Sequence, residues 1–390
     1  MNFFLLIISL VTNIYIIYYI LSIFNRIKNP IQFKLTKIDN KLSITDFYGF
    51  KTSYGLGVDR KENIYIPDFR SGLIYEIKKN CKQTEIYKLK NNKLIKISFF
   101  EKFIVLSFFQ KIFKIFSDIY KPHDIFFDKK DYMYISEMGN GNEKGGGKIS
   151  IFSNHKKLVS QLGINFRNNR GLIDPVMTYV RDNFIYISEC GTNKILRYKK
   201  FNFFDWIGDI NHKVNDNLFN KDNLFFSAKL NKPHGFKIGP DKNFYIVDSN
   251  NHRICKFSSK GIFLGWIGKR DDGSINSNWS KKGKSIKGKD LGAFNTPIDI
   301  VFYKNFIILS DCFNHRLVKI SFSGKSLMWF GENKNNDNLN LIWKKKGFSL
   351  PSKSSTGLYK PFSLKVIKNK IFIADKENLR IKVLKFNQFY

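Results

Sequence analysis

Cysteine, proline and acidic residues are all scarce in this chain of 390 residues. The four cysteines are far apart, and no two of them form a Cys-x-x-Cys pair; they are Cys81, Cys190, Cys255 and Cys312. This spacing argues against a zinc finger, and four cysteines are too few for a disulfide scaffold of this length. The 9 prolines and 26 glycines do not make a low-complexity linker, and a hydrophobic content of 43% is enough for a full core.

The shortage of acidic residues leaves a net charge of +34, from 66 basic and 32 acidic side chains. Such a charge attracts polyanions. Arginine, which reads phosphates and bases better than lysine, is scarce as well, with 11 arginines against 55 lysines. An excess of Lys, Asn, Ile and Phe is typical of the codon bias of an AT-rich genome. We therefore do not expect specific nucleic-acid binding, and RNA binding on a basic face is the weakest of the hypotheses considered.

Charged residues are absent from residues 3–24. As a helix this segment would span ~33 Å, enough to cross a bilayer core. No basic residue precedes it and no small-x-small site follows it, so we expect an uncleaved membrane anchor over residues 1–24 and a basic tether over residues 25–40. The nearest cations follow the span, which predicts a cytoplasmic C-terminal part. The opposite orientation stays open, because the whole chain is rich in lysine.

One unit is repeated six times along the rest of the chain. In the clearest copy, residues 232–257, alternating apolar residues are followed by a polar turn, a second strand that ends on Asp248, a hairpin and a third strand. A fourth strand ends in an aromatic residue and glycine, as in Trp266-Ile-Gly268. Five copies open with a proline and the most degenerate one with a serine: Pro122, Pro175, Pro233, Pro297, Pro361 and Ser53. Four short antiparallel strands in six copies predict an all-β fold, a six-bladed β-propeller over residues 41–390.

These residues resemble the NHL repeat, in which Pro-x-Gly-Ile-Ala-Val-Asp, Ile-Tyr-Val-Ala-Asp and Asn-His-Arg-Ile follow one another. The match is specific in two copies, which keep Asn251-His-Arg253 and Asn314-His-Arg316, and it extends over about residues 42–386. The last copy lacks a fourth strand after Phe386, and residues 41–50 have the pattern to supply it. Such pairing would close the ring and remove its exposed edges.

An acidic residue ends the second strand of every copy: Asp68, Glu137, Glu189, Asp248, Asp311 and Asp375. Four of these acids are followed five residues later by a cation: Lys194, Arg253, Arg316 and Arg380. A feature repeated in every blade is not a catalytic set. We interpret these residues as structural ion pairs or turn caps.

The position after each opening residue should begin the innermost strand and lie at the central channel. It reads Tyr54, His123, Val176, His234, Ile298 and Phe362. The two histidines lie in alternate copies, a spacing that suits a three-ligand metal site. Among NHL propellers, these Pro-His motifs are similar to those of the peptidyl-α-hydroxyglycine α-amidating lyases, which implies a zinc held by His123 and His234. Phe362 departs from that pattern, because a phenylalanine cannot bind a metal.

Two classes of function remain. The first is a membrane-anchored, monomeric propeller that binds a protein or small-molecule ligand through one face and the channel, where we place Tyr54, Asp124 and Phe362. Fold alone supplies no chemistry, and no nucleophile–base pair can be identified, so we expect this non-enzymatic class. The alternative is a zinc-dependent enzyme, lyase-like or hydrolase-like, centred on the two histidines. Two insertions, residues 269–293 and 332–358, are expected to form loops on one face.

Overall fold

The computed structural model describes residues 32–37, 42–48, 53–79, 84–98, 118–139, 146–163, 172–199, 201–208, 229–333 and 343–386. The membrane anchor expected over residues 1–24 lies outside the described residues. Within the described part of the chain, no helix is both long and apolar enough to span a membrane.

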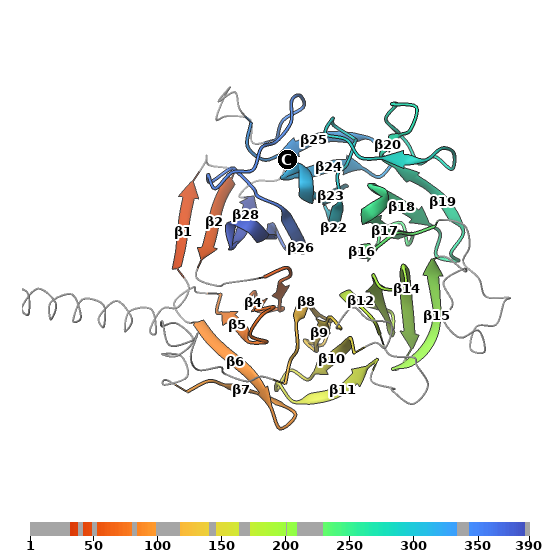
Figure 1. Ribbon diagram of the computed structural model, residues 1–390. Helices are drawn as coiled ribbons and strands as arrows, with labels where there is room; N and C mark the ends of the chain where they lie inside the picture. Colours follow the sequence, from red (N-terminus) through yellow and green to blue (C-terminus); the bar gives the residue numbers. More distant parts are fainter. Residues whose placement is uncertain are drawn as a thin grey trace, which may run out of the picture.

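Six antiparallel sheets surround a central axis, so the chain forms a six-bladed propeller (Figure 1). The first blade consists of β3 (Gly57–Val58), β4 (Ile64–Pro67), β5 (Ile74–Ile77), β6 (Thr84–Lys90) and β7 (Lys93–Lys96). The second consists of β8 (Pro122–Phe127), β9 (Met133–Glu137), β10 (Lys148–Phe152) and β11 (Leu158–Leu162). The third consists of β12 (Pro175–Arg181), β13 (Phe184–Glu189), β14 (Lys194–Lys199) and β15 (Asn202–Gly208).

The remaining blades repeat this order. The fourth consists of β16 (Pro233–Ile238), β17 (Phe244–Asp248), β18 (Arg253–Phe257) and β19 (Phe263–Ile267). The fifth consists of β22 (Pro297–Tyr303), β23 (Phe306–Asp311), β24 (Arg316–Ser321) and β25 (Ser326–Phe330). The sixth consists of β26 (Pro361–Ile367), β27 (Lys370–Asp375), β28 (Arg380–Phe386), β2 (Leu42–Tyr48) and β1 (Gln32–Lys37). Between the fourth and fifth blades, β20 (Lys269–Arg270) and β21 (Ser285–Ile286) form a small ribbon in the first insertion.

The ring is closed by strands from the two ends of the chain. Strand β2 pairs with β28 along its whole length, from Leu42–Phe386 to Tyr48–Arg380, which confirms the expected closure. Strand β1 pairs in turn with β2. Part of the segment interpreted as a tether is therefore a fifth strand of the last blade. The sequence did not reveal it because residues 32–37 stand outside the repeat, and their alternation of polar and apolar residues is short; Leu35, for example, is 55% exposed.

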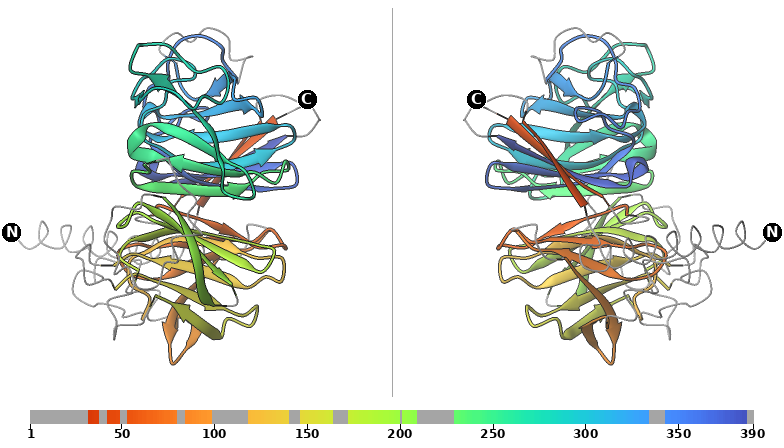
Figure 2. Two further views of the ribbon diagram at one scale, coloured as in Figure 1. Left: turned by 90° about the vertical axis from the view of Figure 1, so that its right-hand side faces the viewer. Right: turned by 90° about the vertical axis from the view of Figure 1, so that its left-hand side faces the viewer.

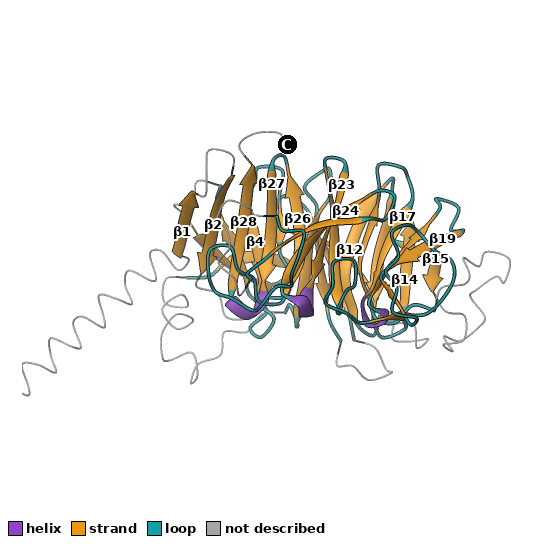
Figure 3. Ribbon diagram, turned by 90° about the horizontal axis from the view of Figure 1, so that it is seen from above, coloured by secondary structure: helices purple, strands orange, loops and turns teal. Residues whose placement is uncertain are grey.

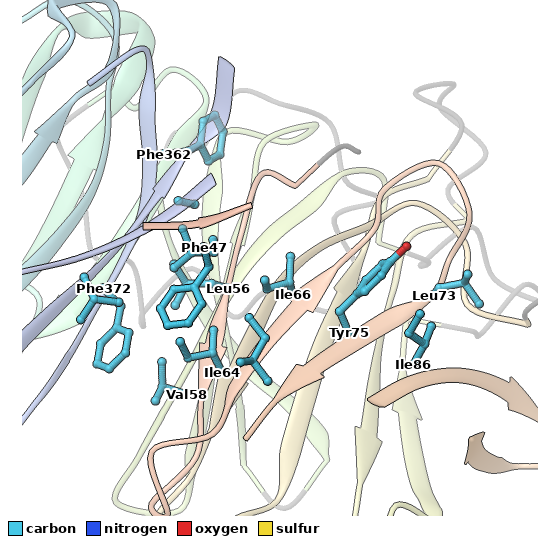
Figure 4. Close-up of a cluster of buried hydrophobic side chains, with 14 of the residues drawn as sticks. Phe47, Leu56, Val58, Ile64, Ile66, Leu73, Tyr75, Ile86, Phe362 and Phe372 are labelled. Carbon is cyan, nitrogen blue, oxygen red and sulfur yellow. The ribbon is translucent and has the colours of Figure 1, made fainter. Parts of the chain in front are cut away.

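A buried cluster fills the seam between the last and first blades. Phe47 and Phe372 of the sixth blade meet Leu56, Val58 and Ile64 of the first, and all of these side chains are less than 9% exposed (Figure 4). Closure therefore buries apolar surface as well as pairing backbone groups, and both contributions stabilise the ring.

The inner strands cross the ring from one face to the other (Figure 2). They are β3, β8, β12, β16, β22 and β26. In the five blades that open with proline, the pairing register shifts directly after that residue. Such a shift leaves the next residues unpaired with the second strand and re-aims their side chains. Three short 3-10 helices lie on the face where the inner strands begin: η5 (Ser249–Asn251), η6 (Cys312–Asn314) and η7 (Lys376–Asn378) (Figure 3).

Candidate ligand-binding channel

Four aromatic rings meet at the end of the channel where the inner strands begin, which we call the Pro-His end. The ring of Tyr54 stacks on that of His123, with centroids 5.1 Å apart. The ring of Phe362 lies 5.3 Å from His123 and 5.9 Å from His234. His123 is 3% and Phe362 7% exposed, and the ammonium of Lys376 lies 4.4 Å from the centroid of the Tyr54 ring. The predicted channel residues thus pack against one another and close this end.

Both histidines at the Pro-His end bond to backbone carbonyls through Nδ1. The Nδ1 atom of His123 lies 2.8 Å from the oxygen of Val176, and that of His234 lies 3.0 Å from the oxygen of Lys232. Because a carbonyl oxygen only accepts hydrogen bonds, each Nδ1 carries the proton and each Nε2 keeps a lone pair. Burial lowers the pKa of His123 to about 3 and that of His234 to about 4. Both imidazoles are therefore neutral near pH 7.

The two histidines come together as the sequence predicted, but the third ligand of a zinc site is not beside them. Their ring centroids are 6.2 Å apart. The Sγ atom of Cys190 lies 3.7 Å from Nδ1 of His234, and burial raises the pKa of that thiol well above its usual value. Among the described residues, no group of three His, Cys, Asp or Glu side chains is placed to hold a metal. A stable zinc site normally requires three or four protein ligands.

The repeated acids and cations form contacts between neighbouring segments of the same blade. Three carboxylates pair with the arginine five residues later: Asp248 with Arg253 at 2.7 Å, Asp311 with Arg316 at 2.9 Å and Asp375 with Arg380 at 2.6 Å. Each carboxylate also accepts a backbone N–H bond from the segment before its own blade, as Asp311 does from Asn295 at 2.8 Å. Glu137 and Glu189 likewise accept such bonds from Tyr120 and Asp174, whereas Asp68 accepts one from Arg70 in the turn that follows it. Lys194 lies over the Trp206 ring.

The histidines of the Asn-His-Arg motifs link one blade to the next. His252 and His315 end the helices η5 and η6 in the left-handed conformation. Their Nδ1 atoms accept the backbone N–H bonds of Thr296 and Lys360, at 3.0 and 3.2 Å. Those two residues precede the opening prolines of the next blades, so the motif fixes the spacing between blades.

Further along the axis, two buried carboxylates each hold a lysine. Asp124 accepts hydrogen bonds from Nζ of Lys365 at 2.8 Å and from Oγ of Ser363 at 2.9 Å. Asp299 accepts from Nζ of Lys237 at 3.1 Å and from the backbone N–H of Leu364 at 2.9 Å. Burial raises the pKa of Asp124, and the Lys365 ammonium opposes that shift. Burial lowers the pKa of Lys237, opposed by Asp299 and reinforced by the charge of Lys365.

Two glycines make room for these carboxylates. Gly55 and Gly235 stand two residues after their strand-opening residues, the repeat position that Asp124 and Asp299 occupy in the following blades. A Cβ atom on Gly55 would lie 2.4 Å from a carboxylate oxygen of Asp124, and one on Gly235 would lie 2.8 Å from Asp299. Any larger side chain would push the carboxylate out of place. The glycines thus allow the two acids to reach across to the lysines.

A cavity of about 700 Å³ occupies the end of the channel where the inner strands end, which we call the lysine end. Every blade contributes to its lining, through Val58, Phe126, Tyr179, Lys237, Phe302 and Lys365. Arg60 and Lys129 lie at its exposed rim. Its volume falls in the range of small-molecule sites, roughly 300–1,000 Å³. Two acids also line it, Asp59 and Asp128, but both accept hydrogen bonds within their own turns.

Comparison with known proteins shows the same architecture. The NHL repeat family matches residues 230–257. The chain is a six-bladed β-propeller with an NHL repeat. No curated protein sequence matches it significantly.

Solved structures of propellers match this chain over most of its length. A protein of unknown function from Bacteroides thetaiotaomicron is 12% identical, with a TM-score of 0.55, over 91% of this chain and 76% of that one. A gluconolactonase from Xanthomonas campestris is 9% identical, with a TM-score of 0.52, over 92% and 95%. An auxiliary nutrient binding protein from Bacteroides ovatus is 13% identical, with a TM-score of 0.52, over 92% and 76%. Identities this low describe the fold alone.

The sequence analysis of this propeller missed Lys237, Asp299 and Lys365. Apart from Asp124, it considered only the residue that follows each opening residue. A signal was present three residues further on, where the inner strands read Phe126, Tyr179, Lys237, Val301 and Lys365. A lysine in a strand whose other residues are buried needs a partner or an opening, and here it has both.

Proposed function

We propose that the protein is a binding module that holds a small-molecule ligand in the cavity at the lysine end of its channel. One observation carries the proposal: a single cavity on the ring axis is lined by all six blades. Ligand sites are commonly concave and mostly apolar with a few convergent polar groups, as this cavity is. The structural neighbours include a nutrient binding protein and a gluconolactonase, so propellers of this shape serve both binding and catalysis. The choice between a binding and a catalytic function therefore depends on the residues of the site and not on the fold.

A neutral fluorescent probe, N-phenyl-1-naphthylamine, tests the proposal. We expect the probe to bind saturably at one site on the propeller. Val366 lines the cavity, and Val366→Phe should weaken the probe about tenfold by filling the space. Val159 lies on the outer strand β11 and is 49% exposed, so Val159→Phe is the matched control.

Circular dichroism first establishes that each variant is folded. Phe126→Trp is a second cavity-filling variant on a different blade, in case Val366→Phe unfolds. Equal probe affinity in the folded wild-type, cavity-filling and control proteins would refute the proposed site.

A zinc-dependent enzyme at the Pro-His end is the second candidate function. The observation that favours it is the shared tautomer of His123 and His234, which leaves both Nε2 lone pairs available to a metal. Water or a substrate group would have to complete the coordination. Elemental analysis of the purified protein distinguishes the two functions, because stoichiometric zinc that is lost in His123→Gln favours the enzyme.

We also propose that residues 3–24 anchor the propeller to a membrane, with the propeller on the cytoplasmic side. The uncharged run and the cations that follow it support this. Protease treatment of intact cells tests it: the propeller should be protected from outside. Digestion from outside would overturn the orientation, and a mature N-terminus after Phe24 would overturn the anchor.

A further inference from the structure

The ammonium groups at the lysine end have more hydrogen-bond donors than partners. A lysine ammonium has three N–H donors. Lys237 donates to Asp299, and Lys365 donates to Asp124 and to Ser363 at 3.2 Å. Among the described residues no further oxygen partner of either ammonium is found, so three N–H groups remain beside the cavity. The two side chains are each 12% exposed and both line the cavity, so a ligand in the cavity can accept these N–H bonds.

The charges of the two lysines act on each other. Lys237 and Lys365 line the same cavity, and Asp299, which accepts from Lys237, also accepts the backbone N–H of Leu364, the residue before Lys365, at 2.9 Å. The charge of Lys365 accordingly contributes to lowering the pKa of Lys237. A negative charge placed beside both would relieve this repulsion and accept the remaining N–H bonds. Carboxylates and sulfonates fit this requirement, because they carry the charge and only accept hydrogen bonds.

The walls around the lysines are aromatic. Phe126 and Tyr179 lie with ring centroids 5.5 Å apart, and the ammonium of Lys237 lies 5.7 Å from the Tyr179 ring. Phe302 lines the cavity from the fifth blade. The acids of the lining are occupied elsewhere: Asp59 binds Asn63, and Asp128 binds Tyr132 and Tyr134. An apolar ring can thus lie against these walls while its charged group reaches the lysines.

We propose that the ligand of the cavity is an aromatic or alicyclic monoanion, with its carboxylate or sulfonate bound between Lys237 and Lys365 and its ring against Phe126, Tyr179 and Phe302. This inference rests on the proposed binding function and names the ligand class for the same site. It concerns the end of the channel opposite the two histidines, and it uses side chains that the zinc hypothesis does not involve.

Two probes with one ring system separate charge from shape. 1-Anilinonaphthalene-8-sulfonate carries the anion, and N-phenyl-1-naphthylamine is its neutral counterpart. We expect Lys237→Gln to weaken the sulfonate about tenfold and to leave the neutral probe within about twofold, because only the anion uses the ammonium. Lys365→Gln should act in the same direction.

Lys256→Gln is the matched control. Lys256 is also 12% exposed, pairs with Asp241 at 2.9 Å and lies 5.1 Å from the Tyr245 ring, but it is outside the cavity. The sulfonate should bind Lys256→Gln as it binds the wild type. This control also accounts for the general attraction of a basic protein for anions, because Lys237→Gln and Lys256→Gln lower the net charge by the same amount.

Lys237→Gln leaves Asp299 buried without its cation, so that variant could unfold. The double variant Lys237→Gln/Asp299→Asn removes both charges together and keeps a hydrogen-bonding pair. It should fold, bind the neutral probe and lose the sulfonate preference.

The outcomes separate the inference from the proposed function. A sulfonate affinity that falls in the Lys237 variants but not in Lys256→Gln supports the inference. Unchanged sulfonate affinity in folded Lys237 variants overturns the inference, and so does an equal loss of affinity in Lys256→Gln. In either case the proposed function stands if Val366→Phe still weakens binding of the neutral probe. Failure of both probes to bind the wild type overturns both.

Discussion

The two ends of the channel are formed by the same six inner strands, but they differ in how many hydrogen-bond donors of their side chains have partners. At the Pro-His end, aromatic rings pack together, both histidines bond to carbonyls, and buried Asp–Arg pairs lie beside the opening prolines of three blades. At the lysine end aromatic side chains line a cavity of about 700 Å³, and ammonium donors exceed their partners. The comparison agrees with the proposal that one end stabilises the ring and the other end binds a ligand. Changes at each end should therefore affect different properties.

The largest expected effect is on stability, from a change near the Pro-His end. Arg316 is fully buried and donates to Asp311 and to the carbonyls of Lys289, Asp290 and Ala293. Arg316→Met should lower the free energy of unfolding by about 3–5 kcal/mol, because it leaves a buried carboxylate without its cation. Urea denaturation measures this.

The control for that variant is an exposed pair, Arg270 with Asp272 at 3.0 Å. Arg270→Met should cost less than about 1 kcal/mol. Probe binding at the lysine end should survive in folded Arg316→Met. Comparable losses of stability in the two variants would show that the buried Asp311–Arg316 pair contributes no more than a surface pair.

The next effect is the response of the Pro-His end to acid. His123 has an ordinary pKa of 6.5, lowered to about 3 in the folded protein by burial, the neighbouring His234 and Lys376. Below pH 6.5 the unfolded chain therefore binds a proton that the folded chain does not, so stability is lost as pH falls. Between pH 6.5 and pH 4 this group should account for about 3 kcal/mol.

His123→Gln keeps a donor for the carbonyl of Val176 but does not titrate. Its free energy of unfolding should fall less steeply than that of the wild type over the same range, as measured by urea titrations at several pH values. Parallel pH profiles for the two proteins would contradict the neutral, buried state assigned to this histidine.

A smaller effect concerns metal binding. Phe362 lies where a third imidazole would complete a set with His123 and His234. Phe362→His should raise zinc affinity about tenfold by adding that ligand. Competition with a zinc-binding dye measures this, and Phe362→Leu controls for loss of the ring. An unchanged affinity would show that the two histidines are not oriented to share a metal.

The sequence allowed the ring to be predicted because each blade repeats the same local rules. The blades could be recognised from three repeated features: an opening proline, an acid at the end of the second strand such as Asp248, and an aromatic–glycine end such as Trp266-Ile-Gly268. Because the last copy lacks a fourth strand, the pairing of β2 with β28 could also be predicted. Strand β1 was not predicted, because its six residues lie before the first repeat and have no counterpart in the other blades. The repeat itself implied the closeness of His123 and His234, because equivalent positions meet on the axis.

The lysine end was harder to predict because it does not repeat. Asp124 and Lys365 lie in the second and sixth blades, and they meet only because Gly55 leaves room between them. Asp299 and Lys237 pair across two other blades, with Gly235 beside them. A pattern read along one strand does not show which side chains meet across the ring. The cavity likewise forms where the ends of six inner strands come together, so the sequence of one strand does not reveal it.

The most direct test of the account is a crystal structure of the propeller with 1-anilinonaphthalene-8-sulfonate bound. We expect the probe in the cavity, with its sulfonate within hydrogen-bonding distance of the ammonium of Lys237 or Lys365 and its rings against Phe126 and Tyr179. A probe bound at the Pro-His end, among His123 and its neighbours, would contradict the account, and so would an empty cavity at saturating probe.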